Sequence, residues 1–178
     1  MPKMENTSPI AEFQTLKPEE LLLNPFTLIG KDWMLVTATD GEGNANPMTA
    51  SWGGMGVLWN RPVCFIFIRP QRYTHDFALK GERMTLSFFD EEYRGVLRTC
   101  GTVSGREVDK AKTCRLTPLR DGAGAVYYAE AKTVLSVRTL YRGPLEKCGF
   151  LDPSLLSHYP EEDFHTVFVA EVTEVRQK

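Results

Sequence analysis

Short runs of apolar and β-branched residues recur along the chain, separated by turn-forming residues. The longest run, residues 63–68 (VCFIFI), is apolar at every position, as in a strand buried on both faces. Residues 40–44 (DGEGN) form a strong turn signal that would send the chain back antiparallel to the strand before it. The same reasoning predicts further strands at residues 33–39, 46–52, 84–89 and 166–172 and, as long strands or a hairpin, at 125–141.

Only short helices are predicted between these strands. Residues 73–81 favour a helix with Thr74 as its N-cap, Asp76 in its first turn and Gly81 at its end. Further short helices are expected at residues 91–100 and 107–114, and a helical turn at 16–22. Many strands without a regular alternation of strand and helix predict a mainly β fold, a barrel or sandwich with accessory helices.

The chain length of 178 residues fits one domain. Residues 1–15 lack periodicity and are interpreted as a flexible leader, with the domain spanning residues 16–178. Three glycines in four residues, Gly53, Gly54 and Gly56, mark a place where the backbone bends or another group comes close.

The charges are balanced, with 21 basic and 23 acidic side chains and a net charge of −2. This balance provides no overall field for nucleic acid or an anionic membrane, so we expect neither as a partner. The N-terminus leads into polar residues, so no signal peptide is evident, and the apolar runs are too short to span a bilayer. These features predict a cytoplasmic protein.

The cysteines are widely spaced and include no Cys-x-x-Cys pair. This pattern predicts unpaired thiols in a reducing compartment, and the scattered histidines match no zinc pattern, so we expect no metal site. Cys100 is interpreted as a buried, inert thiol, with a redox-active thiol as the alternative. His165 is interpreted as a surface histidine, with a place in a ligand pocket as the alternative.

Two arginines lie between the predicted buried strand and the helix predicted to begin at residue 73. Arg69 and Arg72, with Thr74 and the helix N-terminus, together offer the donors that a phosphate group needs, because guanidinium groups bind phosphate through two hydrogen bonds. From composition alone, solvated or ion-paired arginines are the alternative interpretation, and an anion pocket is a hypothesis.

Four stretches in order give the chain a family resemblance: residues 46–54 (NPMTASWGG), 69–74 (RPQRYT), 86–89 (LSFF) and 104–110 (SGREVDK). Together they resemble the flavin reductase-like, FMN-binding split-barrel family over residues 26–172, nearly the whole chain. The resemblance implies a six-stranded antiparallel split β-barrel of Greek-key type with short flanking helices. It also implies a homodimer that holds FMN in a groove near the subunit interface.

Carried over by position, the resemblance implies roles for single residues. The segment 48–52 would line the flavin, Arg69, Arg72 and Thr74 would hold the phosphate, and Tyr73 would lie beside the ribityl chain. Asn46 and Lys110 would lie near the polar edge of the flavin ring, with a solvated helix lysine as the alternative for Lys110. The implied cofactor-binding residues are Asn46, Met48, Thr49, Ala50, Ser51, Trp52, Arg69, Arg72, Tyr73, Thr74, Lys110 and, packed under the ring, Ser87 and Phe88.

The resemblance implies an NAD(P)H-dependent flavin reductase, in which hydride passes from a transiently bound nicotinamide to FMN, or to FAD in its place. No side chain need act as an acid, base or nucleophile, so we expect no catalytic residue. Two alternatives stay open. One is a flavoredoxin-like electron carrier served by a redox partner protein, and the other is a split-barrel binding module without a redox role.

Overall fold

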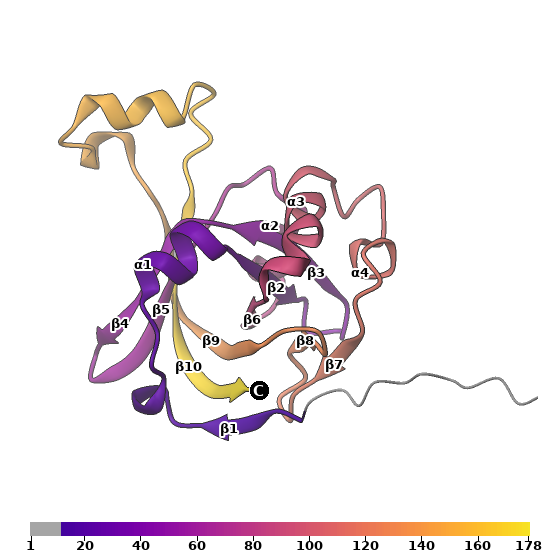
Figure 1. Ribbon diagram of the computed structural model, residues 1–178. Coiled ribbons are helices and arrows are strands. Elements are labelled where there is room, and N and C mark those ends of the chain that lie inside the picture. The colour runs from indigo at the N-terminus through magenta and orange to yellow at the C-terminus, as the bar shows by residue number, and fades with distance from the viewer. Residues whose placement is uncertain (1–11) are drawn as a thin grey trace, which may run out of the picture.

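The protein is described by a computed structural model covering residues 12–178, in which a bent antiparallel sheet dominates (Figure 1). Its strand order is β3-β2-β6-β9-β10-β5-β4, and β1 also pairs with β10. The strands are β1 (Gln14–Leu16), β2 (Met34–Thr39), β3 (Ala45–Ala50), β4 (Gly53–Leu58), β5 (Arg61–Ile68), β6 (Arg83–Phe88), β9 (Thr133–Pro144) and β10 (Thr166–Gln177). A separate hairpin contains β7 (Pro118–Arg120) and β8 (Val126–Tyr128).

This architecture confirms the mainly β class with short helices, although the main sheet has eight strands where the resemblance implied six. The strand β1 begins at Gln14, where Gln14 pairs with Gln177, so pairing starts before the expected domain boundary at residue 16. The rest of the expected leader, residues 1–11, lies outside the described residues.

Strand β10 joins the two halves of the sheet. It pairs with β9 from Thr166 to Gln177, and with β5 over its first half, from Thr166 opposite Ile68 to Glu171 opposite Val63. Beyond the end of its pairing with β5, β10 pairs with β1 along its last residues. The two ends of the strand order, β3 and β4, are joined by a corner of two residues rather than by a ladder.

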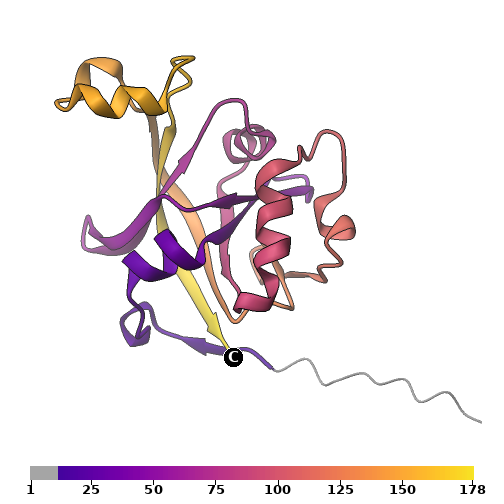
Figure 2. The same ribbon diagram turned by 45° about the horizontal axis from the view of Figure 1, so that its top comes forward.

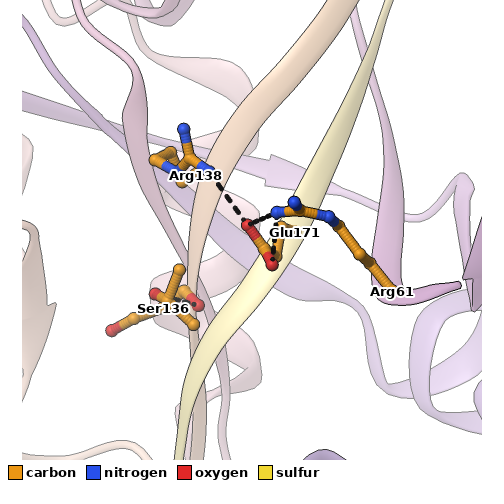
Figure 3. Close-up of polar contacts among 5 residues, drawn as sticks. Arg61, Ser136, Arg138 and Glu171 are labelled. Carbon is orange, nitrogen blue, oxygen red and sulfur yellow. Dashed lines mark hydrogen bonds and ion pairs between the residues drawn. The ribbon is translucent and has the colours of Figure 1, made fainter. Parts of the chain in front are cut away.

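An ion triad lies near the point where β5 leaves β10 (Figure 3). Arg61 of β5 donates to both carboxylate oxygens of Glu171 at 2.9 Å, and Arg138 of β9 donates to one of them at 3.0 Å. Each pair is partly exposed and therefore contributes little by itself. Together the three side chains link neighbouring strands in the observed register.

The helical segments are short and lie between the strands. They are η1 (Pro18–Glu20), α1 (Pro25–Thr27) with η2 (Leu28–Asp32), α2 (Tyr73–Lys80), η3 (Glu91–Tyr93) with α3 (Arg94–Thr102), α4 (Lys110–Thr113), η4 (Lys147–Gly149) and η5 (Pro153–His158). The predictions at 73–81 and 91–100 are confirmed, whereas the helix expected at 107–114 shortens to α4. Among residues 12–178, no helix has the length and apolar character needed to cross a membrane.

One sequence expectation fails locally, and another is confirmed in one of its two forms. Thr74 is not the N-cap of α2; Arg72 occupies that position with extended backbone, and the Thr74 hydroxyl instead accepts a hydrogen bond from Asn46 Nδ2 at 2.7 Å. The glycine-rich segment forms β4 rather than a bend, because the chain turns just before it, and the expected close approach of another group is confirmed at Gly53. A Cβ atom at Gly53 would lie 3.0 Å from the Phe65 carbonyl oxygen, so glycine allows β4 to pack closely on β5.

Apolar side chains fill both faces of the sheet around β2. Met34 and Val36 point into the larger cluster, which also contains Ile66 and Phe168, while Leu35 points to the opposite face. That second cluster packs beneath α3 and the β7–β8 hairpin through Leu97, Cys100 and Tyr128. Burial on both faces explains why β2 has no exposed residue and fixes α3 beside the end of β3.

Candidate functional site

The corner between β3 and β4 forms a cavity of about 140 Å³, which we call the corner pocket. The end of β5, the start of α2 and the residue before β10 complete its walls. It brings together seven of the residues predicted from the sequence, and its lining is Met48, Thr49, Ala50, Ser51, Trp52, Phe67, Arg69, Arg72 and His165.

Arg72 is a partly buried cation at this pocket. Its Nη2 donates one long hydrogen bond, 3.4 Å, to the Cys100 carbonyl oxygen, and among residues 12–178 it forms no ion pair. Burial lowers the pKa of its guanidinium, although an arginine stays protonated at neutral pH. A buried charge without a counter-ion is costly, so an anion bound here would stabilise the site.

Arg69 has different surroundings. Its Nη1 donates to Asp163 Oδ2 at 2.6 Å and its Nη2 donates to the His158 carbonyl oxygen at 2.7 Å. Gln71 Nε2 donates to the same carboxylate oxygen at 2.5 Å. These hydrogen bonds lower the pKa of Asp163, which therefore stays ionised and holds Arg69. An anion reaching Arg69 has to replace this carboxylate.

Strand β3 and helix α3 position the hydroxyl and backbone groups at the corner. Thr49 Oγ1 donates to the Leu97 carbonyl oxygen at 2.5 Å, which ties β3 to α3 and leaves the hydroxyl lone pairs free to accept. In the described part of the chain, β3 ends the strand order, so one edge of its backbone has no strand partner. A ligand at the corner can use these polar groups.

Three other predicted residues meet in a neighbouring cavity of about 370 Å³, which Asn46, Tyr73 and Lys110 help to line. Lys110 is 3% exposed, so the alternative of a solvated lysine is wrong. Its Nζ donates to the carbonyl oxygens of Pro47 at 3.0 Å and Cys100 at 2.9 Å. Burial, followed by the Arg72 cation, lowers the pKa of Lys110 to about 8.

The Cys100 carbonyl oxygen connects the two cavities, because Arg72 and Lys110 both donate to it. The loop before α4 closes over the second cavity at Gly105. A Cβ atom at this position would overlap with the Asn46 side chain, so glycine allows the loop to approach Asn46 in its observed position. The two cavities therefore share a wall built from α3 and this loop.

The remaining predicted residues do not line either cavity. Thr74 is 1% exposed and is bonded to Asn46. Ser87 and Phe88 are fully buried because β6 is an inner strand, with β2 and β9 on its two edges and apolar clusters on both faces. The structure thus places Ser87 and Phe88 within the sheet rather than at the pocket.

The segment joining β9 to β10, residues 145–165, contributes residues that sequence reasoning missed. It extends away from the sheet in both ribbon views (Figures 1 and 2). Asp163 and His158 contact Arg69, and the His158 ring lies 5.3 Å from that of Trp52. The acidic run at 161–163 was visible in the sequence, but nothing there indicated that it meets residue 69.

His165, expected on the surface, is 8% exposed and lies at the pocket, so that expectation is wrong. Its Nδ1 lies 2.8 Å from the Tyr159 hydroxyl, and its ring centroid is 5.4 Å from that of Trp52. Burial and the nearby Arg69 cation lower the pKa of His165 to about 4, so the ring is neutral at physiological pH. It therefore adds an aromatic wall rather than a charge.

Comparison with known families decides what this fold is. A model of the flavin reductase-like domain matches residues 28–178. The chain belongs to the flavin reductase-like family. The family match covers every residue that lines the corner pocket, from Met48 to His165. No curated protein matches the chain.

Solved structures with this family's fold resemble the chain at low sequence identity. Flavoredoxin of Desulfovibrio vulgaris (Miyazaki F) is 21% identical with a TM-score of 0.65, covering 82% of this chain and 69% of its own. An FMN-binding protein from Thermus thermophilus is 22% identical with a TM-score of 0.65, covering 93% and 82%. The NADH:FAD oxidoreductase of Streptomyces globisporus C-1027 is 19% identical with a TM-score of 0.61, covering 83% and 74%. At these identities the likeness establishes the shared fold.

Proposed function

We propose that the chain is an FMN-binding flavoprotein that acts as an NAD(P)H-dependent flavin reductase. The observation that carries the proposal is Arg72, a partly buried cation without an acidic partner among residues 12–178, facing the same cavity as the 48–52 corner. Among biological ligands, a flavin mononucleotide combines an anionic phosphate with a flat polar ring system. FAD, which carries a larger phosphate group, is the alternative nucleotide.

The residues of the corner pocket fit the parts of this cofactor. Arg72, with Arg69 once Asp163 has moved away, would hold the phosphate, and the corner from Met48 to Trp52 would hold the ring. The cavity, at about 140 Å³, is smaller than the roughly 300–1,000 Å³ of ordinary ligand pockets, so the cofactor would extend beyond it. The assignment of Asn46 and Lys110 to the ring edge requires them to exchange their present partners.

Bound FMN would supply the hydride-accepting chemistry of the proposed reaction. The residues of the chain would bind and orient the cofactor. The guanidinium groups of Arg69 and Arg72 would hold its phosphate, and the neutral His165 and Phe67 would exclude water from one wall of the pocket. Trp52 is 45% exposed, which leaves the corner open to a transiently bound nicotinamide. No side chain is assigned a proton-transfer role.

An electron carrier is the second candidate, because two of the similar structures are flavoredoxins. In that case FMN stays bound and a redox partner protein supplies the electrons. The first test is the visible absorption spectrum of the purified protein with FMN, followed by NADH or NADPH under anaerobic conditions. Bleaching by nicotinamide supports the reductase, and bound flavin that does not bleach supports the carrier. If the protein fails to bind FMN at all, both are wrong and a non-redox binding module remains.

The phosphate assignment has its own test. Replacing Arg69 and Arg72 together with alanine should weaken FMN binding at least tenfold while changing riboflavin binding much less, since each charge-assisted contact contributes about 1.5–3 kcal/mol. Arg98→Ala is the matched control, because Arg98 is exposed on α3 and lies outside the pocket. An equal loss for FMN and riboflavin would contradict the assignment.

We further propose that the protein is a cytoplasmic homodimer. Support comes from an apolar groove of about 550 Å³ between the N-terminal segment and the β4–β5 hairpin, to which Leu21, Met55 and Val57 contribute. At the hairpin tip, Trp59 is 54% exposed and has a φ of 54°, a conformation that the turn requires and that tryptophan rarely adopts. An exposed tryptophan beside an apolar groove suits contact with a second copy.

A further inference from the structure

Two cysteines lie close together at the wall shared by the two cavities. Cys100 belongs to α3, Cys114 follows α4 as its C-cap, and their Sγ atoms are 3.8 Å apart. The other two cysteines lie elsewhere, Cys64 in the core on β5 and Cys148 exposed in the 145–165 segment. Only this pair has its sulfur atoms in contact among the described residues.

We propose that Cys100 and Cys114 are a redox-active pair that forms a reversible disulfide when the protein meets hydrogen peroxide. A disulfide bond is about 2.05 Å long, so the two sulfur atoms need to approach each other by less than about 2 Å. The four-residue helix α4 lies between two loop segments, which makes Cys114 the side of the pair that can move.

Each cysteine has a distinct part in the chemistry. Cys114 is partly exposed and is therefore the thiol that peroxide reaches first, whereas Cys100 is fully buried. Burial raises the pKa of Cys100 to about 12, although the Lys110 and Arg72 cations act in the opposite direction. Cys100 is thus protected from direct oxidation and acts as the second, resolving thiol.

Formation of the disulfide takes two steps. The Cys114 thiolate attacks one peroxide oxygen, the O–O bond breaks, and the other oxygen leaves as hydroxide and becomes water with the thiol proton. Cys114 is then a sulfenic acid. The Cys100 sulfur attacks the Cys114 sulfur, the S–S bond forms, the S–O bond breaks, and hydroxide leaves with the Cys100 proton as a second water. Two electrons pass from the sulfurs to peroxide.

The cross-link would close the chain from residue 100 to residue 114 into a covalent loop. This loop contains Gly105, which contacts Asn46, and Lys110, which donates to the Cys100 carbonyl oxygen. Oxidation would therefore hold the wall of the second cavity in place by a bond rather than by hydrogen bonds alone. The inference depends on the cysteine geometry and does not require the proposed flavin chemistry.

The test is peptide mapping of the wild-type protein after peroxide treatment and blocking of the remaining free thiols. Trypsin can cut after Arg106 and Lys112, so the disulfide would join the peptides 99–106 and 113–115. We expect this joined peptide, a loss of two of the four free thiols, and full recovery of both with dithiothreitol. Recovery of both peptides unjoined, or irreversible oxidation of Cys114, would overturn the proposal.

Two variants separate the pair from other thiol chemistry. Cys148→Ser should form the same joined peptide, because Cys148 lies outside the pair, whereas Cys114→Ser should form none and retain Cys100 as a free thiol. A non-reducing gel should show a monomer-sized band after oxidation. A covalent dimer that Cys148→Ser abolishes would assign the oxidation to Cys148 instead and contradict the proposal.

Discussion

At the scale of single residues, the two arginines of the corner pocket illustrate what local sequence reveals. Arg72 was identified because it stands between an apolar strand and a helix, and both elements follow from local patterns. The partner of Arg69 was not identified, because Asp163 is brought to it only by the pairing of β5 with β10. The Thr74 hydroxyl was misassigned because an N-cap and the second residue of a helix look alike in sequence.

Lys110 gives a prediction on pH and stability. Its pKa is about 8 in the folded protein and near 10.5 when the chain unfolds, so between these values the unfolded state binds more protons. The free energy of unfolding attributable to Lys110 should therefore rise as pH increases from 8 to 10. The expected gain is on the order of 1 kcal/mol.

Denaturant unfolding of wild type and Lys110→Met across this pH range measures the effect as a difference between the two proteins. Other groups that titrate in the range cancel in that difference. Lys112→Met is the matched control, because Lys112 is exposed on the same helix. If Lys110→Met follows the same pH profile as wild type, the amine is not held as the structure indicates.

At the scale of elements, apolar runs located most strands and missed those whose identity depends on neighbours. The run at 63–68 became β5 as expected, but its burial on both faces is incomplete, because Phe65 and Phe67 are only half-buried. The glycine-rich β4 carries little side-chain signal and becomes a strand only because β5 offers it an edge. The short β1 is likewise defined by its pairing with the end of β10. Such strands cannot be predicted from local propensity.

The segment between β9 and β10 brings one carboxylate, that of Asp163, to Arg69 of the corner pocket. Its base is closed by a hydrogen bond from the Leu145 amide to the His165 carbonyl oxygen at 2.8 Å. Beyond this it contacts Arg69 through the Asp163 carboxylate, the His158 carbonyl oxygen and the Tyr159 ring. Asp163→Asn keeps the side-chain shape and removes the negative charge. We expect FMN to bind several-fold more tightly to this variant, because the phosphate no longer competes with an anion for Arg69.

Quenching of flavin fluorescence during titration measures this affinity, with riboflavin as the ligand that lacks a phosphate. Glu162→Gln is the control, since Glu162 is paired with Lys147 rather than with the pocket. Weaker FMN binding by Asp163→Asn would mean that Asp163 supports the anion site instead of competing with it.

At the scale of the whole molecule, the family resemblance gave the fold class, while strand number and exposed surfaces required the structure. The apolar groove beside β4 gives a prediction here. Val57 is 76% exposed, and Val57→Asp would place a charge within the proposed dimer contact. We expect this variant to be monomeric by light scattering under conditions where wild type is dimeric.

Leu151→Asp is the control for this experiment, because Leu151 is 97% exposed in the 145–165 segment and does not line the groove. It should leave the molar mass unchanged. A monomeric wild type, or loss of the dimer in both variants, would contradict the assignment of this face.

The central place of β10 has a consequence for how the protein is made. Strands β5 and β9 meet only through β10, which follows both of them in the chain. Until residues 166–177 have left the ribosome, the nascent polypeptide carries two open sheet edges, those of β5 and β9. Each edge is rich in apolar residues and can pair with a strand of another polypeptide. Pairing of the two halves of the sheet therefore waits for β10, so the open edges are exposed to aggregation during synthesis.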